Sequence, residues 1–150
     1  LGLAVVMEPG RNLVGNAGIM VTEVQYVKDN PLKKFIVVDA AMNDLIRPSL
    51  YQAHHDILPV SETSETVFGD IVGPICESGD FLAKGRCLPP LNRGDLLATF
   101  SAGAYGMAMS SNYNSRPRAA EVMVDGEKVH LVRERESIAD IIRGEHRLPD

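Results

Sequence analysis

The chain has 150 residues, of which 45% are hydrophobic and 23% charged, and its formal net charge is −5 at pH 7. Such a composition is average for a globular domain, so it argues against disorder, and the length allows one domain with a real core. The acidic balance argues against bulk nucleic-acid binding, and no apolar run reaches the roughly 20 residues of a membrane span.

The first predicted element is a buried strand over residues 3–7, a short apolar run that ends abruptly at a Pro-Gly turn. Continuous apolar runs of this kind are typical of parallel strands that are covered on both faces. The chain has no initiator Met and opens inside this run, so we interpret it as part of a longer protein. The run lacks the basic flank and the cleavage site of a signal peptide.

The next two predicted strands form a hairpin. Residues 18–28 and 34–39 are rich in Val, Ile, Thr and Tyr, and the turn cluster Asp29-Asn30-Pro31 separates them. Residues 43–55 are polar and contain a proline, so irregular chain or short helical turns are expected there.

Strand and loop signals alternate through the middle of the chain. Residues 57–60 and 66–75 are possible strands, and two glycines in the second suggest a bulge or a close backbone approach. Residues 78–94 contain three glycines and two prolines and are predicted to be a loop. Residues 95–100 are predicted to be a strand.

The last predicted elements are a hairpin and a short helix. Residues 119–132 contain Asp125-Gly126, a strong two-residue turn signal. Ser137 and Asp140 fit a capping box, and Gly144 can end the helix. About seven strands and one short helix predict a mainly β fold, either a β-sandwich or a closed β-barrel.

Two segments carry residues suited to anion binding. Residues 8–11 (EPGR) follow the first predicted strand, so backbone N–H groups beside Gly10 and the planar fork of Arg11 could hold a phosphate or carboxylate. If Pro48 begins a helical turn, Arg47 and Tyr51 face one way and form a carboxylate clamp. Taken alone, each segment is more typical of an ordinary turn or a solvated surface.

Two further segments could carry chemistry. Cys76 and Glu77 adjoin a glycine-containing turn, where a thiol could donate a proton and a carboxylate could bind an ammonium group. Tyr105 lies between glycines that would let the backbone approach a flat ligand. Taken alone, each of these is again more typical of a structural cysteine loop or an aromatic plug.

The remaining candidates favour structural interpretations. His54 and His55 adjoin an aspartate, but no third ligand has a recognisable spacing, so a surface histidine pair is favoured and no metal site is predicted. Cys76 and Cys87 form no CxxC motif, which favours reduced thiols and a cytoplasmic protein.

Four motifs together resemble the C-terminal portion of the diaminopimelate decarboxylases, within the alanine-racemase-like and ornithine-decarboxylase-like group of pyridoxal-phosphate enzymes. The resemblance runs from Val5 to about Arg118. EPGR is shared across the group, whereas RPSLY with CESGD is specific to the diaminopimelate branch, since ornithine decarboxylases lack this glutamate after the cysteine. The motifs are EPGR (8–11), RPSLY (47–51), CESGD (76–80) and GAYG (103–106).

The resemblance implies a fold and a reaction. Residues 1–15 would end an N-terminal (β/α)8 barrel that binds pyridoxal 5'-phosphate, and residues 16–150 would form the C-terminal β domain with its short terminal helix. The reaction would be the decarboxylation of meso-2,6-diaminopimelate to L-lysine and CO2. The enzyme would be a homodimer whose cysteine loop enters the neighbouring subunit's active site. Its location would be cytoplasmic, or plastidial if the source is a plant.

The resemblance also implies roles for individual residues. Cys76 would be the catalytic proton donor. The expected substrate-binding residues are Arg11, Arg47, Tyr51, Glu77 and Tyr105, of which Arg47 and Tyr51 would bind the distal carboxylate and Glu77 the distal ammonium. The expected cofactor-binding residues are Glu8, Pro9, Gly10, Arg11 and Tyr105.

One departure from the family pattern limits what this chain can do alone. None of its lysines matches the motif of the barrel lysine to which the family attaches its cofactor, so we expect this chain by itself neither to bind the cofactor tightly nor to decarboxylate. Two alternatives stay open: a related decarboxylase of another basic amino acid or carboxylated polyamine, and a non-catalytic β-barrel dimerisation module.

Overall fold

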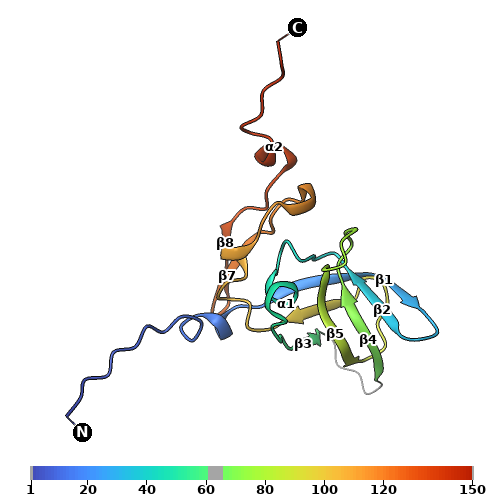
Figure 1. Cartoon of the computed structure of the whole chain (residues 1–150), viewed down its shortest axis with the longest axis horizontal. Coiled ribbons are helices and arrows are strands. Elements are labelled where there is room, and N and C mark those ends of the chain that lie inside the picture. Colours follow the sequence, from blue (N-terminus) through green and yellow to red (C-terminus); the bar gives the residue numbers. More distant parts are fainter. Residues whose placement is uncertain (1, 61–65, 150) are drawn as a thin grey trace.

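A curled six-stranded sheet is the main body of the molecule (Figure 1). The computed structural model describes residues 2–60 and 66–149. The strands of this sheet are β1 (Met20–Asp29), β2 (Lys34–Val38), β3 (Ile57–Pro59), β4 (Val67–Val72), β5 (Phe81–Leu88) and β6 (Leu96–Thr99). Their order is β3-β6-β1-β2-β4-β5, and only β2 and β4 run parallel. The predicted hairpin of β1 and β2 and the strands β3, β4 and β6 are confirmed.

The sheet curls until its edge strands β3 and β5 approach each other, which gives a nearly closed barrel. A side chain helps to close the gap, because Arg86 on β5 donates to the carbonyl oxygen of His55, just before β3, at 3.1 Å. The interior is aliphatic, and burying each such side chain stabilises the fold by about 1.5–3 kcal/mol. Its fully buried members are Val24, Ile36, Val38, Leu45, Ile71, Leu82 and Leu97. The predicted mainly β, barrel-like fold is confirmed.

The predicted loop over residues 78–94 is wrong, because β5 runs through the middle of it. Gly85 lies inside this strand at φ +61°, and its N–H donates to Asp70 Oδ1 at 2.9 Å. The pairing of β4 with β5 shifts register here, with Gly69 opposite Arg86 and Ile71 opposite Ala83. The glycine therefore forms a β-bulge within the strand, where the sequence suggested the end of regular structure.

The buried strand predicted over residues 3–7 is not present in the described structure. Leu3, Val5 and Val6 are 80–87% exposed, and the segment runs away from the barrel (Figure 1). A strand has to pair its backbone groups with a neighbour, and no described strand pairs with this segment. Leu1 lies outside the described residues. The assignment of residues 1–15 to the end of a second domain stays a prediction.

The C-terminal hairpin stands beside the barrel (Figure 1). It consists of β7 (Glu121–Asp125) and β8 (Lys128–Arg133), which turn at Gly126 as predicted. A short helix, α2 (Ile138–Ile141), follows, and Ser137 and Asp140 form the predicted capping box. Almost every side chain of the hairpin is exposed, so its stability depends little on burial within this chain. The remaining helical segments are α1 (Arg47–Tyr51), η1 (Gly15–Ala17), η2 (Met107–Met109) and η3 (Tyr113–Ser115).

Candidate active site

A five-residue helix, α1, places an arginine between two tyrosines. Pro48 fits the first turn of the helix, and Gln52 ends it at φ +53°. The guanidinium carbon of Arg47 lies 5.3 Å from the ring centroid of Tyr51 and 5.3 Å from that of Tyr105. We call these three residues the arginine cluster. The Nε atom of Arg47 is buried and has no hydrogen-bond partner among the described residues, so the cluster has an unused donor.

Tyr105 is held in this cluster by a strained turn. Its φ is +63°, which is unusual for a residue with a side chain. The turn packs tightly on η1, since the N–H of Gly103 donates to the carbonyl oxygen of Gly15 at 3.1 Å. A Cβ on Gly103 would lie 2.1 Å from the carbonyl oxygen of Val14. This glycine is therefore needed for contact within the chain, whereas the sequence suggested approach to a ligand.

The same packing brings the EPGR segment towards the cluster. A Cβ on Gly10 would lie only 2.8 Å from the hydroxyl oxygen of Tyr105. The Arg11 side chain packs beside Gly15. Glu8 and Pro9 are exposed on the extended N-terminal segment. Gly10 is thus the member of EPGR that the structure brings next to Tyr105.

His55 lies close to both arginines and is buried, so the predicted surface histidine pair is wrong for this residue. It is 1% exposed, whereas His54 is exposed. Its Nδ1 lies 2.8 Å from the carbonyl oxygen of Phe100, and because only a protonated nitrogen can donate to a carbonyl, Nδ1 carries the proton of the neutral ring. Its Nε2 is then an acceptor, and it is buried without a partner in the described chain. Burial lowers the pKa of His55, and the charges of Arg11 and Arg47 lower it further.

Cys76 and Glu77 occupy a loop, residues 73–80, which we call the cysteine loop. Asp80 organises it from inside: its carboxylate accepts the N–H of Met42 at 2.7 Å and that of Ile75 at 2.9 Å. Both Cys76 and Glu77 are exposed. A buried aspartate therefore holds a loop that presents a thiol and a carboxylate outward.

The Glu77 carboxylate is hydrogen-bonded on both oxygens. Oε1 accepts the N–H of Gly79 at 3.0 Å, and Oε2 accepts the hydroxyl of Tyr113 at 3.0 Å. These two donors lower the pKa of Glu77, so the carboxylate is favoured as an ion. Sequence reasoning missed Tyr113, and its position seven residues after the GAYG motif carries no pattern that would have pointed to Glu77.

The arginine cluster and the cysteine loop lie on different sides of α1. A Cβ on Gly79 would lie 2.7 Å from Ser49 Oγ, so the loop packs against Ser49. Ser49 is two positions from both Arg47 and Tyr51, and residues two apart on a helix point about 200° apart. The predicted site residues therefore form two groups within one chain: Arg47, Tyr51, Tyr105 and Gly10 in one, and Cys76 and Glu77 in the other.

Other candidate groups do not add to the site. The lysines lie in the strands and turns of the sheets, where Lys33 pairs with Asp70 and Lys34 with Asp29. Within residues 2–60 and 66–149, no three His, Cys, Asp or Glu side chains gather closely enough to hold a metal ion. No helix in the described part of the chain is long and apolar enough to cross a membrane.

Comparison with known proteins gives consistent matches. Residues 5–103 match the family of pyridoxal-dependent decarboxylases, C-terminal sheet domain. A diaminopimelate decarboxylase of Aquifex aeolicus is 59% identical over 92% of this chain and 33% of its own length. One of Pseudomonas fluorescens is 57% identical over 99% of this chain and 36% of its own length. The crystal structure of a diaminopimelate decarboxylase from M. jannaschii in co-complex with L-lysine superposes with a TM-score of 0.89 at 41% identity, over 95% of this chain and 32% of that one. The chain thus spans about a third of the length of these relatives.

Proposed function

Because the chain belongs to the pyridoxal-dependent decarboxylase family as its C-terminal sheet domain, we propose that its whole protein converts meso-2,6-diaminopimelate into L-lysine and CO2. The observation that carries the proposal is the arginine cluster, in which Arg47 lies 5.3 Å from each of two tyrosine rings with a buried, unused Nε donor. Such a cluster suits a carboxylate that the reaction keeps. In this proposal residues 1–15 end the cofactor-binding barrel and residues 16–150 form the β domain.

The residues around Gly10 fit one edge of pyridoxal 5'-phosphate. The absence of a side chain at Gly10 lets the Tyr105 hydroxyl pack against its backbone, and backbone N–H groups beside a glycine can approach an anion or a flat ring. Glu8, Pro9, Gly10, Arg11 and Tyr105 would hold this edge. When bound, the cofactor stores the electron pair left by the departing CO2. The lysine that attaches it belongs to another part of the whole protein in this proposal, since the lysines described here lie in the sheets.

The arginine cluster binds the end of the substrate that does not react. Meso-diaminopimelate has two amino-acid ends, and only the D end loses CO2. A carboxylate of the L end can accept from the half-buried Arg47 guanidinium and from the hydroxyl of the exposed Tyr51. Arg11 and Tyr105 complete this wall.

The cysteine loop binds the distal ammonium group and donates the proton. Glu77, which its hydrogen bonds favour as a carboxylate, binds the ammonium group of the L end. Cys76 returns a proton to the carbon that lost CO2, because a thiol is mostly protonated at neutral pH and can act as a general acid. Both side chains are exposed, so they are available to a neighbouring molecule.

We propose a homodimer with shared active sites, which the arrangement of the two groups supports. Within one chain the cysteine loop and the arginine cluster lie on different sides of α1, so a single chain does not present all of them to one substrate. A two-fold axis allows the loop of one subunit to meet the cluster of its partner, and the reverse contact then forms as well. We place the enzyme in the cytoplasm, where free thiols such as those of Cys76 and Cys87 stay reduced.

Decarboxylation by the full-length protein tests this function. Purified protein loaded with pyridoxal phosphate is incubated with meso-diaminopimelate, and CO2 and L-lysine are measured. We expect equal amounts of the two products and at least about 100-fold lower kcat/KM with L-ornithine or L-arginine, because neither carries the distal carboxylate and ammonium pair that Arg47 and Glu77 recognise.

The same assay separates the alternatives. Comparable turnover of L-ornithine would favour a decarboxylase of another basic amino acid. Absence of CO2 from every substrate, in a protein that still dimerises, would favour a non-catalytic dimerisation module. Either result would contradict the proposed function.

A further inference from the structure

Tyr113 makes the one side-chain hydrogen bond to Glu77 in the described chain. Its hydroxyl donates to Oε2 at 3.0 Å, while the backbone N–H of Gly79 donates to Oε1 at the same distance. The pKa of Tyr113 is raised by this carboxylate, so its hydroxyl stays a donor at neutral pH. With one oxygen fixed from the loop and the other from outside it, the carboxylate plane has little freedom to rotate.

The two residues also share a cavity. It has a volume of about 470 Å³, and Glu77, Tyr113, Ser49 and Met42 contribute to its walls. Tyr113 therefore reaches across from a different part of the chain to the outward-facing tip of the cysteine loop. The hydrogen bond of its hydroxyl to Glu77 joins the Tyr113 segment to the cysteine loop.

The segment that carries Tyr113 is strained. Asn114 and Ser115, which follow it, have φ values of +62° and +54°, in a region that residues with side chains rarely occupy. Two such residues in succession persist only where surrounding contacts fix the backbone, and strain of this kind gathers at functional sites.

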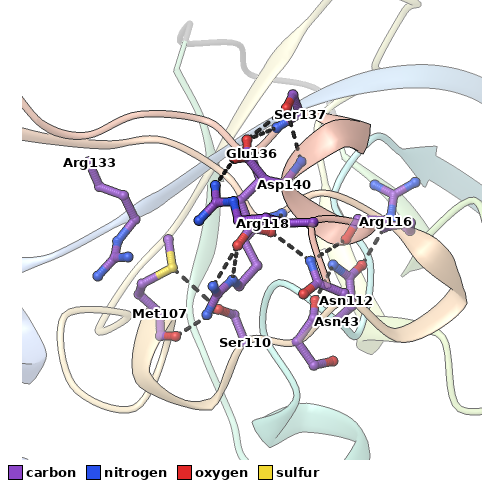
Figure 2. A network of polar contacts seen from close by, with 12 residues as sticks. Asn43, Met107, Ser110, Asn112, Arg116, Arg118, Arg133, Glu136, Ser137 and Asp140 are labelled. Carbon is purple, nitrogen blue, oxygen red and sulfur yellow. Dashed lines mark hydrogen bonds and ion pairs between the residues drawn. The ribbon is translucent and has the colours of Figure 1, made fainter. Parts of the chain in front are cut away.

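A polar network supplies those contacts (Figure 2). Asn112 Nδ2 donates to the carbonyl oxygen of Arg116 at 3.0 Å and to Glu136 Oε2 at 2.6 Å. Arg116 Nε donates to Asn43 Oδ1 at 3.0 Å, and Arg118 binds Glu136 through Nε at 2.7 Å. The network ties the Tyr113 segment to the barrel through Asn43 and to the chain before α2 through Glu136. The backbone on both sides of Tyr113 is therefore held by contacts of the fold.

From this arrangement we propose that Tyr113 is a positioning residue for Glu77 and so contributes to the selection of substrates that carry a distal ammonium group. The proposal rests on the proposed function, in which Glu77 binds that group. A fixed carboxylate favours an ammonium at one place, because a charge-assisted hydrogen bond forms there without reorganisation, and a ligand that lacks the ammonium forgoes this bond. Tyr113 itself does not touch the substrate in this proposal.

The test compares two ligands that differ only in the distal ammonium. L-lysine, the product, carries it as its α-amino group, and 6-aminohexanoate is the same molecule without that group. Calorimetric titration of the full-length dimer loaded with pyridoxal phosphate gives both dissociation constants. The Tyr113→Phe change is expected to weaken L-lysine binding about 10-fold and to leave 6-aminohexanoate binding unchanged, because only the hydroxyl that orients Glu77 is lost. The KM for meso-diaminopimelate should rise similarly, with kcat within about twofold of the unaltered enzyme.

The matched control is Tyr26→Phe, which removes the hydroxyl of an exposed tyrosine on β1 and should change neither constant. Equal weakening of both ligands by Tyr113→Phe would show a merely structural residue and overturn the proposal, as would no weakening of either. If the unaltered enzyme decarboxylates meso-diaminopimelate but the Tyr113 variant behaves normally, the proposed function stands and only the role of Tyr113 fails. If the unaltered enzyme does not prefer L-lysine, the role of Glu77 fails as well.

Discussion

The two groups of site residues differ in whether their polar atoms already have hydrogen-bond partners. In the arginine cluster, Arg47 Nε is buried without a partner, and so is Nε2 of the neighbouring His55, within the described chain. In the cysteine loop, Glu77 is exposed, yet both of its oxygens are hydrogen-bonded. The cluster is thus partly desolvated and incomplete, whereas the loop is solvated and preorganised.

This difference indicates how the two groups would be used. A buried donor without a partner costs free energy until a ligand satisfies it, so the cluster is suited to bind an anion within its own subunit. A preorganised carboxylate at an exposed tip is suited to meet a site that another chain forms. Variants on the two sides of α1 should therefore differ in the step that they impair.

The largest effect is expected in the cysteine loop. Cys76→Ala should lower kcat by about 10²–10⁴-fold, the usual contribution of a general acid, and should leave the cofactor spectrum of the holoenzyme largely unchanged. Cys87→Ala removes the other exposed cysteine, on β5, and serves as the control. Steady-state kinetics and absorbance spectra check both variants, and unchanged turnover in Cys76→Ala would remove the proposed acid.

A smaller effect, of a different kind, is expected in the arginine cluster. Arg47→Met keeps an unbranched side chain between the tyrosines but removes the donors, so kcat/KM should fall about 10- to 100-fold, mainly through a higher KM. Arg93→Met, at an exposed arginine before β6, should behave like the unaltered enzyme. A fall in kcat with an unchanged KM would contradict the assignment of Arg47 to the distal carboxylate.

The sequence predicted most of the strands but missed several contacts that position the site. Turn signals and β-branched runs predicted five strands of the barrel and the C-terminal hairpin because these patterns act locally. They failed at Gly85, where a bulge uses a glycine inside β5, and at His55, whose burial depends on the carbonyl of Phe100 far along the chain. The contact of Tyr113 with Glu77 likewise joins distant residues, which no local pattern can predict.

The smallest expected effect concerns stability against acid. The pKa of His55 is lowered mainly by burial and further by Arg11, Arg47 and His54, so the folded protein holds this residue neutral. Below about pH 6.5 His55 binds a proton in the unfolded chain but not in the folded protein. The free energy of unfolding should therefore decrease as the pH is lowered from about 6.5 to the pKa of His55 in the folded protein.

His55→Asn keeps a donor for Phe100 and should reduce this pH dependence in urea denaturation of the full-length protein. His54→Asn, at the exposed neighbour, is the matched control and should retain it. If His55→Asn retained the full slope between pH 7 and 5, burial of a neutral His55 would be contradicted.

The proposed division of one active site between two subunits is tested most directly by mixing variants. Subunits carrying Arg47→Met and subunits carrying Cys76→Ala are given different tags, co-expressed, and purified as the heterodimer. If the cysteine loop of each chain serves the cluster of its partner, one site of the heterodimer contains both unaltered groups. Its kcat/KM should then be about half that of the unaltered dimer, although the kcat/KM of each parent homodimer is at least about 10-fold lower. A heterodimer as inactive as its parents would place Arg47 and Cys76 of one chain in the same site and contradict the account.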